Sequence, residues 1–177
     1  MKKLNLWCGE DIREWYINMD RIKLPWVDTV HDIEKFPYPF NDDMFEEIYC
    51  AMVLEHTTNL TWIMEELIRI SRTWCQIKLL LPYFTCTNFR ADPTHVRLFN
   101  SNSFSWFHSN SFLKKNNFIL KKYKIHFFSN DNNHFMKSKR YSIVPDFIIN
   151  LVPKIYERFF CYIFPASEIH YLLEINK

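Results

Sequence analysis

Glycine is almost absent from this chain, because Gly9 is the only glycine among 177 residues. Phosphate-binding loops of the P-loop and G-x-G-x-x-G types need several glycines at fixed spacing, and neither pattern is present. This absence counts against the common nucleotide-binding enzymes that depend on such loops. It also draws attention to Gly9, since a single retained glycine indicates a backbone conformation that other residues adopt poorly.

A cysteine framework and a membrane span are missing as well. The five cysteines form no C-x-x-C pair, and no Cys/His spacing is typical of a zinc site. An odd number of unpaired cysteines indicates free thiols in a reducing compartment. No apolar run approaches the ~18 residues of a membrane helix, and Met1-Lys2-Lys3 leads into a predicted strand rather than a signal peptide. We therefore expect a cytoplasmic protein.

An excess of one charge is also lacking. The net charge is +2, which favours no nucleic-acid partner. With 48% hydrophobic residues, the chain can bury a substantial core. Its length suits one domain, and we expect residues 1–177 to form it.

The hydrophobic pattern predicts strands that alternate with helices. The predicted strands are Leu4–Trp7, Tyr16–Asp20, Val27–Asp32, Phe45–Met52, Gln76–Leu81, Phe118–Phe128 and Glu168–Ile175. The predicted helical segments are one turn at Asp11–Trp15, a helix from Leu60 to Trp74, a helix at Ser103–Lys115, and two pieces within Pro145–Pro165 that Pro153 divides. Residues 83–99 are expected to be a loop. This alternation predicts an α/β fold with a mostly parallel sheet.

Several polar features fall at the ends of the first predicted strands. Gly9 follows the first strand, Asp20 and Asp32 end the second and third, and residues 52–56 follow the fourth. Parallel sheets bind ligands beyond the carboxyl ends of their strands, where a carboxylate can accept both hydroxyls of a ribose. The sequence therefore predicts a nucleoside site at this edge.

These segments resemble motifs of the class I S-adenosylmethionine-dependent methyltransferases. Leu4-Asn5-Leu6-Trp7-Cys8-Gly9 is similar to the family's LNLGCG turn, Trp15–Asp20 to its W-I-N-V-D strand, and Val53-Leu54-Glu55-His56 to its V-L-E-H segment. Residues 36–49 and 65–70 resemble two further motifs in the same order. The resemblance covers residues 3–82, and the loop Asp92-Pro93-Thr94-His95 resembles one in a subset of the family.

The resemblance implies a three-layer, doubly wound, Rossmann-like sheet of seven strands. In this family the sheet is mostly parallel, its last strand is antiparallel, and helices cover both faces. An aromatic helical insertion at about 129–165 would precede the last strand.

The resemblance also implies S-adenosyl-L-methionine as cofactor and assigns residues to it. The turn of Leu6, Trp7, Cys8 and Gly9 would lie against its methionine and ribose, and Asp20 would accept the ribose hydroxyls. Asp32 would accept the adenine amino group, the backbone of Ile33 would meet a ring nitrogen, and Ala51 and Met52 would border the methionine end. Three departures stand out: Trp7 replaces a glycine, Ser71–Cys75 replaces a Pro-Gly-Gly loop, and Glu46 replaces an aspartate.

His56 and His95 are the candidate catalytic residues, because imidazole titrates near neutral pH and both follow predicted elements at the ligand edge. A packing role for His56 and a loop hydrogen bond for His95 are the alternatives. Asp92 and His95 are two metal-ligand types without a third, so we predict no metal site. Asp92, His95, Tyr83 and Trp106 are candidate acceptor contacts, although the aromatic residues of this stretch are equally typical of a core.

We therefore expect a methyltransferase that acts on a small-molecule or saccharide acceptor, with O-methylation favoured. The alternative is a degenerate protein of the same fold that binds a partner without catalysis, as the substitution of Trp7 and the missing glycines suggest. Residues 147–164 are strongly apolar and aromatic. A lid, a homodimer contact, a peripheral membrane surface or a covering helix would each explain them.

Overall fold

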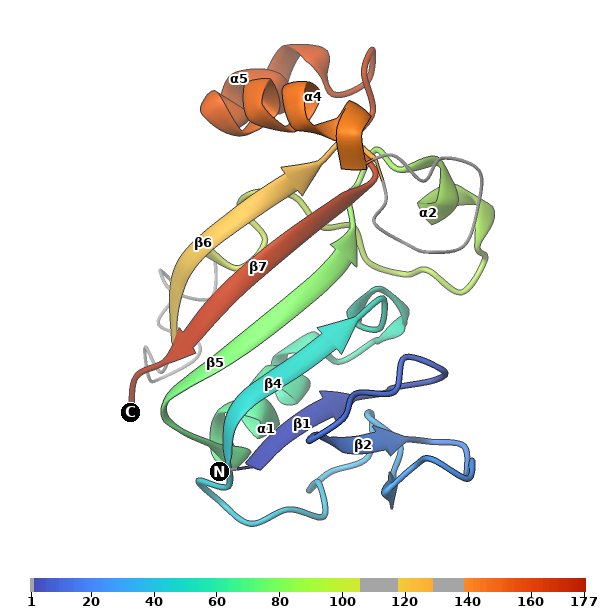
Figure 1. Cartoon of the computed structure of the whole chain (residues 1–177), viewed down its shortest axis with the longest axis vertical. Helices are drawn as coiled ribbons and strands as arrows, with labels where there is room; N and C mark the ends of the chain where they lie inside the picture. Colours follow the sequence, from blue (N-terminus) through green and yellow to red (C-terminus); the bar gives the residue numbers. More distant parts are fainter. Residues whose placement is uncertain (1, 106–117, 129–138) are drawn as a thin grey trace.

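The computed structural model describes residues 2–105, 118–128 and 139–177. These residues form a seven-stranded sheet in the order β3-β2-β1-β4-β5-β7-β6 (Figure 1). The strands are β1 Lys2–Leu6, β2 Ile17–Asp20, β3 Thr29–Val30, β4 Phe45–Ala51, β5 Ser71–Pro82, β6 Phe118–His126 and β7 Glu168–Ile175. The first five pair in parallel, whereas β7 is antiparallel to both β5 and β6. The predicted fold class is confirmed, including the antiparallel last strand.

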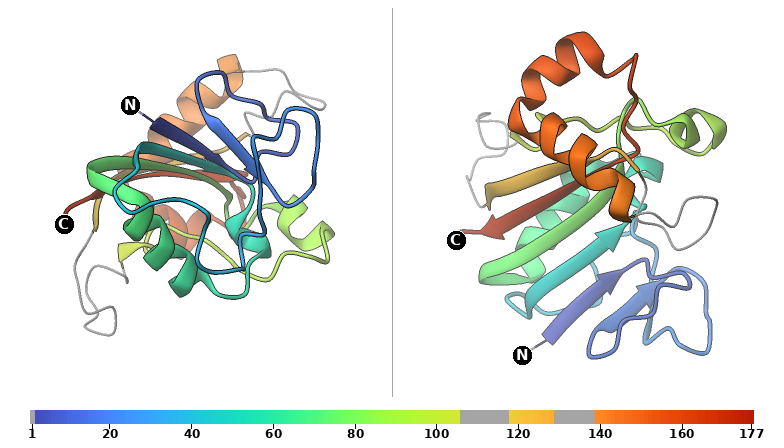
Figure 2. Two further views of the ribbon diagram at one scale, coloured as in Figure 1. Left: turned by 90° about the horizontal axis from the view of Figure 1, so that it is seen from below. Right: turned by 45° about the horizontal axis from the view of Figure 1, so that its top comes forward.

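One face of the sheet carries α1, Leu60–Ile70, which packs against the central strands (Figure 2). Its buried residues recur at helical spacing and are Leu60, Ile63, Met64, Leu67 and Ile70. In β5, Ile77, Leu79 and Leu81 are fully buried, whereas the intervening residues are partly exposed. The apolar stripe of α1 and alternate residues of the sheet thus form the core.

The opposite face is polar where it crosses β1, β4 and β5. Glu47 accepts hydrogen bonds there from Lys78 Nζ at 2.7 Å and from the hydroxyl of Tyr16. Burial alone would raise the pKa of Glu47, but the hydrogen bonds from Lys78 and Tyr16 outweigh it and hold this pKa below its usual value. Lys3 joins the same carboxylate at 3.4 Å. This face is therefore held by ion pairs and hydrogen bonds.

The link between β1 and β2 is described in full and contains no helix, so the predicted turn at Asp11–Trp15 is wrong. Side chains hold the link instead, because Asn18 Oδ1 accepts the Arg13 amide at 3.1 Å and Asn5 Nδ2 donates to the Asp11 carbonyl at 2.6 Å. The Arg13 guanidinium also lies 3.3 Å from the centre of the Tyr49 ring. A short polar link therefore covers β1 and β4.

The boundaries of α1 and β5 also differ from the prediction. The helix ends at Ile70, and β5 begins at Ser71 rather than Gln76. Ser71 pairs with Phe45 in the parallel ladder, and Trp74, which continues the helical apolar spacing, is 65% exposed with φ of 69°. The third strand is shorter than predicted, and α2, Thr87–Ala91, interrupts the expected loop. The helix predicted at Ser103–Lys115 lies mostly outside the described residues.

The C-terminal helices lie beyond the carboxyl ends of β5 and β6 (Figures 1 and 2). They are α4 Lys139–Leu151, α5 Pro153–Ile155 and the short η2 Tyr156–Phe160, and the division falls at Pro153 as predicted. Asp146 of α4 accepts the Phe127 amide at 2.8 Å and lies 2.9 Å from His126 Nδ1. Because His126 alternates with buried Ile125, α4 meets the sheet from the side opposite α1. No helix of the described residues is long and apolar enough to cross a membrane.

Candidate active site

A cleft of about 530 Å³ opens at the carboxyl ends of β1, β2 and β4. It is lined by Trp7, Gly9, Asp20, Arg21, Ile22, Leu24, Asp32, Glu34, Met52, Val53, His56, Thr57 and Thr94. Its position is the edge at which a parallel sheet binds ligands. Its volume lies within the range of roughly 300–1,000 Å³ that small-molecule pockets span. Of the predicted cofactor residues, Trp7, Gly9, Asp20, Asp32 and Met52 line it together.

Asp20 joins the turn after β1 to the end of β2. Its Oδ2 accepts the Gly9 amide at 2.8 Å, and its Oδ1 accepts the Ile22 amide at 2.9 Å. Gly9 has φ of +51°, the left-handed region that glycine adopts without strain, and a Cβ there would meet nothing within 4 Å. The glycine is therefore required for its backbone angle rather than for space. Each Asp20 oxygen keeps acceptor capacity for a ligand, although the residue is only 3% exposed.

Trp7 is the residue of the turn that fits the family pattern least. Its φ is 57°, which costs a non-glycine residue about 1–2 kcal/mol. The Arg21 guanidinium lies 5.1 Å from the centre of its ring, and both residues line the cleft. The indole thus occupies a wall of the cleft where the resemblance would place a glycine.

Replacing Trp7 by glycine is expected to tighten the binding of S-adenosylhomocysteine about tenfold, since the indole leaves the cleft and the backbone strain is relieved. Calorimetric titration measures the change. Trp15→Gly is the matched control, because Trp15 also has positive φ (68°) but is 91% exposed and does not line the cleft. Equal affinity changes in both variants, or weaker binding by Trp7→Gly, would contradict this role of the indole.

The predicted adenine side of the cleft contains Asp32 and Glu34. Asp32 Oδ1 accepts the Glu34 amide at 3.1 Å, and Glu34 Oε1 accepts the hydroxyl and the amide of Thr58, each at 2.6 Å. The hydrogen bonds from Thr58 hold the pKa of Glu34 below its usual value. Two acidic side chains therefore face this end of the cleft, and Glu34 is one that the sequence did not single out.

Four predicted cofactor residues do not line the cleft. Leu6 is fully buried, Ile33 is 1% exposed, and Cys8 is 5% exposed. Burial, followed by the nearby charge of Asp20, raises the pKa of the Cys8 thiol. Ala51 is half-buried at the end of β4. The side chains of Leu6, Cys8 and Ile33 are buried, so any cofactor contact that these three residues make would come from the backbone.

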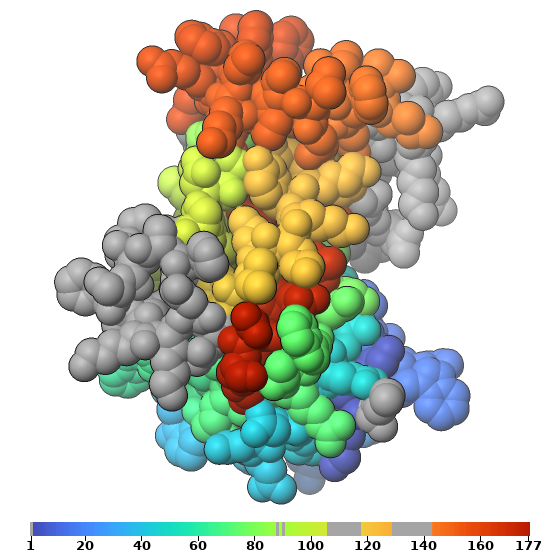
Figure 3. All heavy atoms as spheres, turned by 90° about the vertical axis from the view of Figure 1, so that its left-hand side faces the viewer, coloured from blue at the N-terminus to red at the C-terminus, as the bar shows by residue number. Residues whose placement is uncertain are grey.

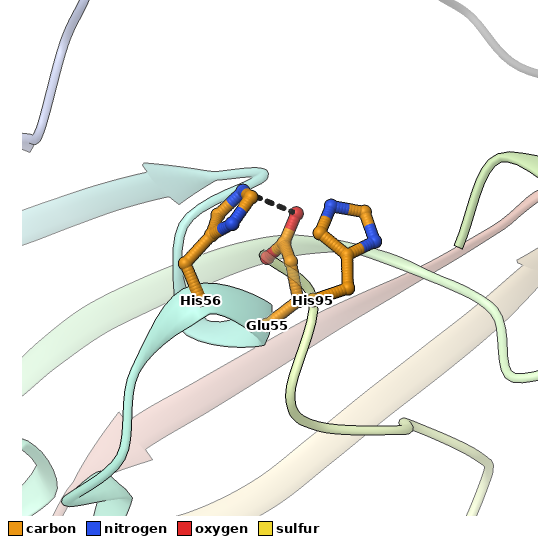
Figure 4. A group of neighbouring side chains, drawn as sticks. All are labelled: Glu55, His56 and His95. Carbon is orange, nitrogen blue, oxygen red and sulfur yellow. Dashed lines mark ion pairs between the residues drawn. The ribbon is translucent and has the colours of Figure 1, made fainter. Parts of the chain in front are cut away.

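His56 and His95 meet beside the cleft, together with Glu55, which the sequence did not single out (Figure 4). Glu55 and His56 belong to the short helix η1, Leu54–His56, and His95 follows α2. The two imidazole centroids are 4.6 Å apart, and His56 Nε2 lies 4.0 Å from Glu55 Oε1. Burial raises the pKa of Glu55 to about 8, while burial and His95 lower the pKa of His56. Burial thus favours the neutral forms of Glu55 and His56.

The predicted acceptor residues separate in the structure. Asp92 lies beside His95, with Oδ2 3.7 Å from His95 Nε2, and its Oδ1 accepts the Thr94 hydroxyl at 2.6 Å. Tyr83 is fully buried beneath the C-terminal helices, where its hydroxyl donates to Glu157 Oε1 at 3.0 Å. It does not line the cleft and belongs to the core, which is the alternative that the sequence left open for the aromatic residues of this stretch. Trp106 lies outside the described residues.

Solved structures identify the fold. A SAM-dependent methyltransferase from Archaeoglobus fulgidus matches 99% of this chain and 86% of its own, with a TM-score of 0.63 and 16% identity. This chain has the class I methyltransferase fold. A methyltransferase of the same cofactor dependence from Mesorhizobium loti covers 98% of this chain and 90% of its own, at a TM-score of 0.56 and 10% identity. No family model and no curated protein matches the sequence.

The methyltransferase fold alone does not fix the reaction. The [4+2]-cyclase SpnF has the same architecture, with a TM-score of 0.58, 11% identity, and coverage of 99% of this chain and 74% of its own. Function must therefore be argued from the side chains of the cleft.

Proposed function

We propose that this protein is an S-adenosylmethionine-dependent methyltransferase that acts on a hydroxyl group of a small-molecule or saccharide acceptor. The observation that carries the proposal is the Asp20 carboxylate, which ends β2, holds the Gly9 turn and lines the cleft. A carboxylate in this place can accept both hydroxyls of a ribose. The cleft volume of about 530 Å³ suits a nucleoside cofactor as well.

The residues of the cleft would act mainly by positioning. When bound, S-adenosylmethionine supplies a methyl group on a sulfonium, which needs alignment with the acceptor more than activation. Asp20 would hold the ribose, and Asp32 would accept the adenine amino group. A hydroxyl acceptor must also lose its proton, and His56 lines the cleft with His95 beside it. These two imidazoles are the groups placed to accept that proton.

Transfer of a labelled methyl group tests the proposal directly. The protein is incubated with S-adenosylmethionine labelled in the methyl group and with panels of hydroxylated small molecules, saccharides and matched amines. We expect label on a hydroxylated acceptor, with equimolar S-adenosylhomocysteine formed. A protein that binds the cofactor and transfers label to no acceptor would overturn the enzymatic role.

That result would favour the second candidate, a binding protein of the same fold without catalysis. Two observations motivate it: the Trp7 indole lines the cleft, and a short link without a helix joins β1 to β2. Failure of the folded protein to bind the cofactor at all would support it most strongly.

The C-terminal helices carry an exposed apolar surface that we assign to peripheral membrane contact. Its members are at least 42% exposed and are Ile143, Val144, Phe147, Ile148, Leu151, Val152, Ile155, Phe159, Phe160, Tyr162, Ile163 and Phe164. Figure 3 shows α4 and the helices after it as a layer over β6 at one end of the molecule. A contiguous surface formed by this many exposed apolar side chains usually contacts a membrane or another molecule.

The charges of this segment support a lipid surface over a second protein copy. Its two acids turn inward: Asp146 is 5% exposed beside His126, and Glu157 accepts the Tyr83 and Ser101 hydroxyls. Lys154 and Arg158 are exposed instead. Exposed apolar side chains together with exposed cations and inward-facing acids are the pattern that binds anionic bilayers.

Charged substitutions in this surface are expected to abolish membrane binding. Phe159→Asp combined with Tyr162→Asp should lower co-sedimentation with anionic phosphatidylglycerol vesicles more than tenfold, because both exposed rings would leave the bilayer. Trp74→Asp is the control, since Trp74 is 65% exposed on β5 away from this surface. Vesicle binding unaffected by the double substitution would contradict the assignment, and a stable dimer without lipid would favour a homodimer contact.

A further inference from the structure

The cluster beside the cleft contains three side chains that bind metals in other proteins. One ligand atom from each of Glu55, His56 and His95 lies within 4.8 Å of the others. Figure 4 shows that a ring nitrogen of each histidine is directed toward the Glu55 carboxylate. The residues come from two segments, η1 and the loop after α2. Spacing along the chain could not show that they meet.

The carboxylate of Glu55 indicates a bound ligand independently of the clustering of the three side chains. Its side chain is fully buried, and neither carboxylate oxygen has a hydrogen-bond partner among residues 2–105, 118–128 and 139–177. Buried carboxylates are normally paired, hydrogen-bonded or coordinated to a metal. His95 Nδ1 is also buried without a partner. The cluster thus holds polar atoms that the described residues leave without a hydrogen-bond partner.

The surroundings hold these side chains in place. The backbone carbonyl of Glu55 accepts the amides of Val96 and Arg97 at 2.8 and 3.2 Å, which fixes the loop of His95 against η1. His56 Nδ1 lies 2.8 Å from Thr94 Oγ1, and the Asp92 carboxylate lies 3.7 Å from His95 Nε2. Metal-binding histidines commonly hydrogen-bond a hydroxyl or carboxylate through one ring nitrogen and bind the metal through the other, as Thr94 at Nδ1 and Glu55 near Nε2 would allow for His56. The distance from Asp92 to His95 is longer than a hydrogen bond.

We propose that Glu55, His56 and His95 bind one divalent transition-metal ion of the zinc class at the edge of the cleft. Two imidazoles and one carboxylate suit zinc better than calcium or magnesium. Three protein ligands leave a coordination position for water or an acceptor oxygen. The sequence predicted no metal site, because Asp92 and His95 alone supply too few ligands. In the structure, Glu55 and His56 join His95.

The metal site deepens the proposed function, and its role toward an acceptor rests on that function. A hydroxyl bound to the ion would lose its proton to water in the cleft more readily, so the two imidazoles would act as ligands rather than as free bases. Metal binding itself needs neither the cofactor nor an acceptor. The two proposals can therefore fail separately.

Calorimetric titration of the chelator-treated protein with zinc chloride, without cofactor, tests the site. We expect one ion per chain with a micromolar or lower Kd, and at least tenfold weaker binding by Glu55→Gln and by His95→Ala. His31→Ala is the matched control, because His31 contacts the Lys35 carbonyl and does not belong to the cluster. It should bind zinc as the unchanged protein does.

Folding is checked by circular dichroism and thermal unfolding of each variant. A folded, unchanged protein that binds no zinc would overturn the proposal, as would equal affinity of Glu55→Gln and the unchanged protein. Titration with S-adenosylhomocysteine on the same samples reports the cofactor cleft alone. Zinc binding without cofactor binding would support the metal site and contradict the proposed function.

Discussion

Asp20→Ala is expected to weaken the binding of S-adenosylhomocysteine at least a hundredfold. Hydrogen bonds to a charged group contribute about 1.5–3 kcal/mol each, and the ribose would lose two of them. The substitution also leaves the amides of Gly9 and Ile22 without their acceptor, which should lower the free energy of unfolding by about 2 kcal/mol. Calorimetry and urea unfolding measure the two effects.

Asp28→Ala separates these two effects. Asp28 Oδ2 accepts the Asn18 amide at 2.8 Å, so its loss should also destabilise the strands, but Asp28 does not line the cleft. We expect this variant to lose stability and keep its affinity. If Asp28→Ala lost affinity as strongly as Asp20→Ala, the loss would reflect general damage to the strand ends rather than a ribose contact.

Glu55→Leu is expected to stabilise the metal-free protein. The carboxylate is buried without a hydrogen-bond partner, and replacing it by an apolar side chain of similar size should raise the free energy of unfolding by about 1–3 kcal/mol. Urea unfolding in the presence of a chelator measures the change. The same variant should lose zinc binding, because it lacks the carboxylate ligand. A gain in stability with a loss of binding is typical of a residue kept for function.

Glu47→Leu provides the contrast for this prediction. Glu47 is also partly buried, but Lys78 and Tyr16 pair with it, so its replacement should destabilise the protein. If Glu55→Leu were destabilised to the same extent, Glu55 would have a structural partner and the metal site would lose its main support.

The sheet and the position of the cleft could be predicted because they follow from local patterns. Gly9 lies in the turn after β1, and Asp20 ends the neighbouring β2. The carboxyl ends of parallel strands meet at one edge of the sheet, whatever the conformation of the links between them. The antiparallel β7 followed from the resemblance to a known family. These features depend on the order of the strands and on the spacing of apolar residues within them, and both can be read from a single sequence.

The features that could not be predicted depend on contacts between distant segments. Trp74 continues the apolar spacing of α1, yet pairing of Ser71 with Phe45 ends the helix earlier and leaves the indole exposed. Glu55 and His95 are forty residues apart in sequence and meet only because the loop after α2 folds back on η1. Tyr83 directly follows β5, a position that predicts a place near the ligand, but the C-terminal helices cover it and its hydroxyl donates to Glu157.

Calorimetric titration of the unchanged protein with S-adenosylhomocysteine is the decisive experiment, because a nucleoside site at Asp20 is the basis of the proposed function. We predict one molecule bound per chain with a Kd in the micromolar range, which corresponds to about −8 kcal/mol. No heat of binding from a protein that is folded by circular dichroism would contradict the proposed nucleoside site and leave a methyltransferase fold without its cofactor.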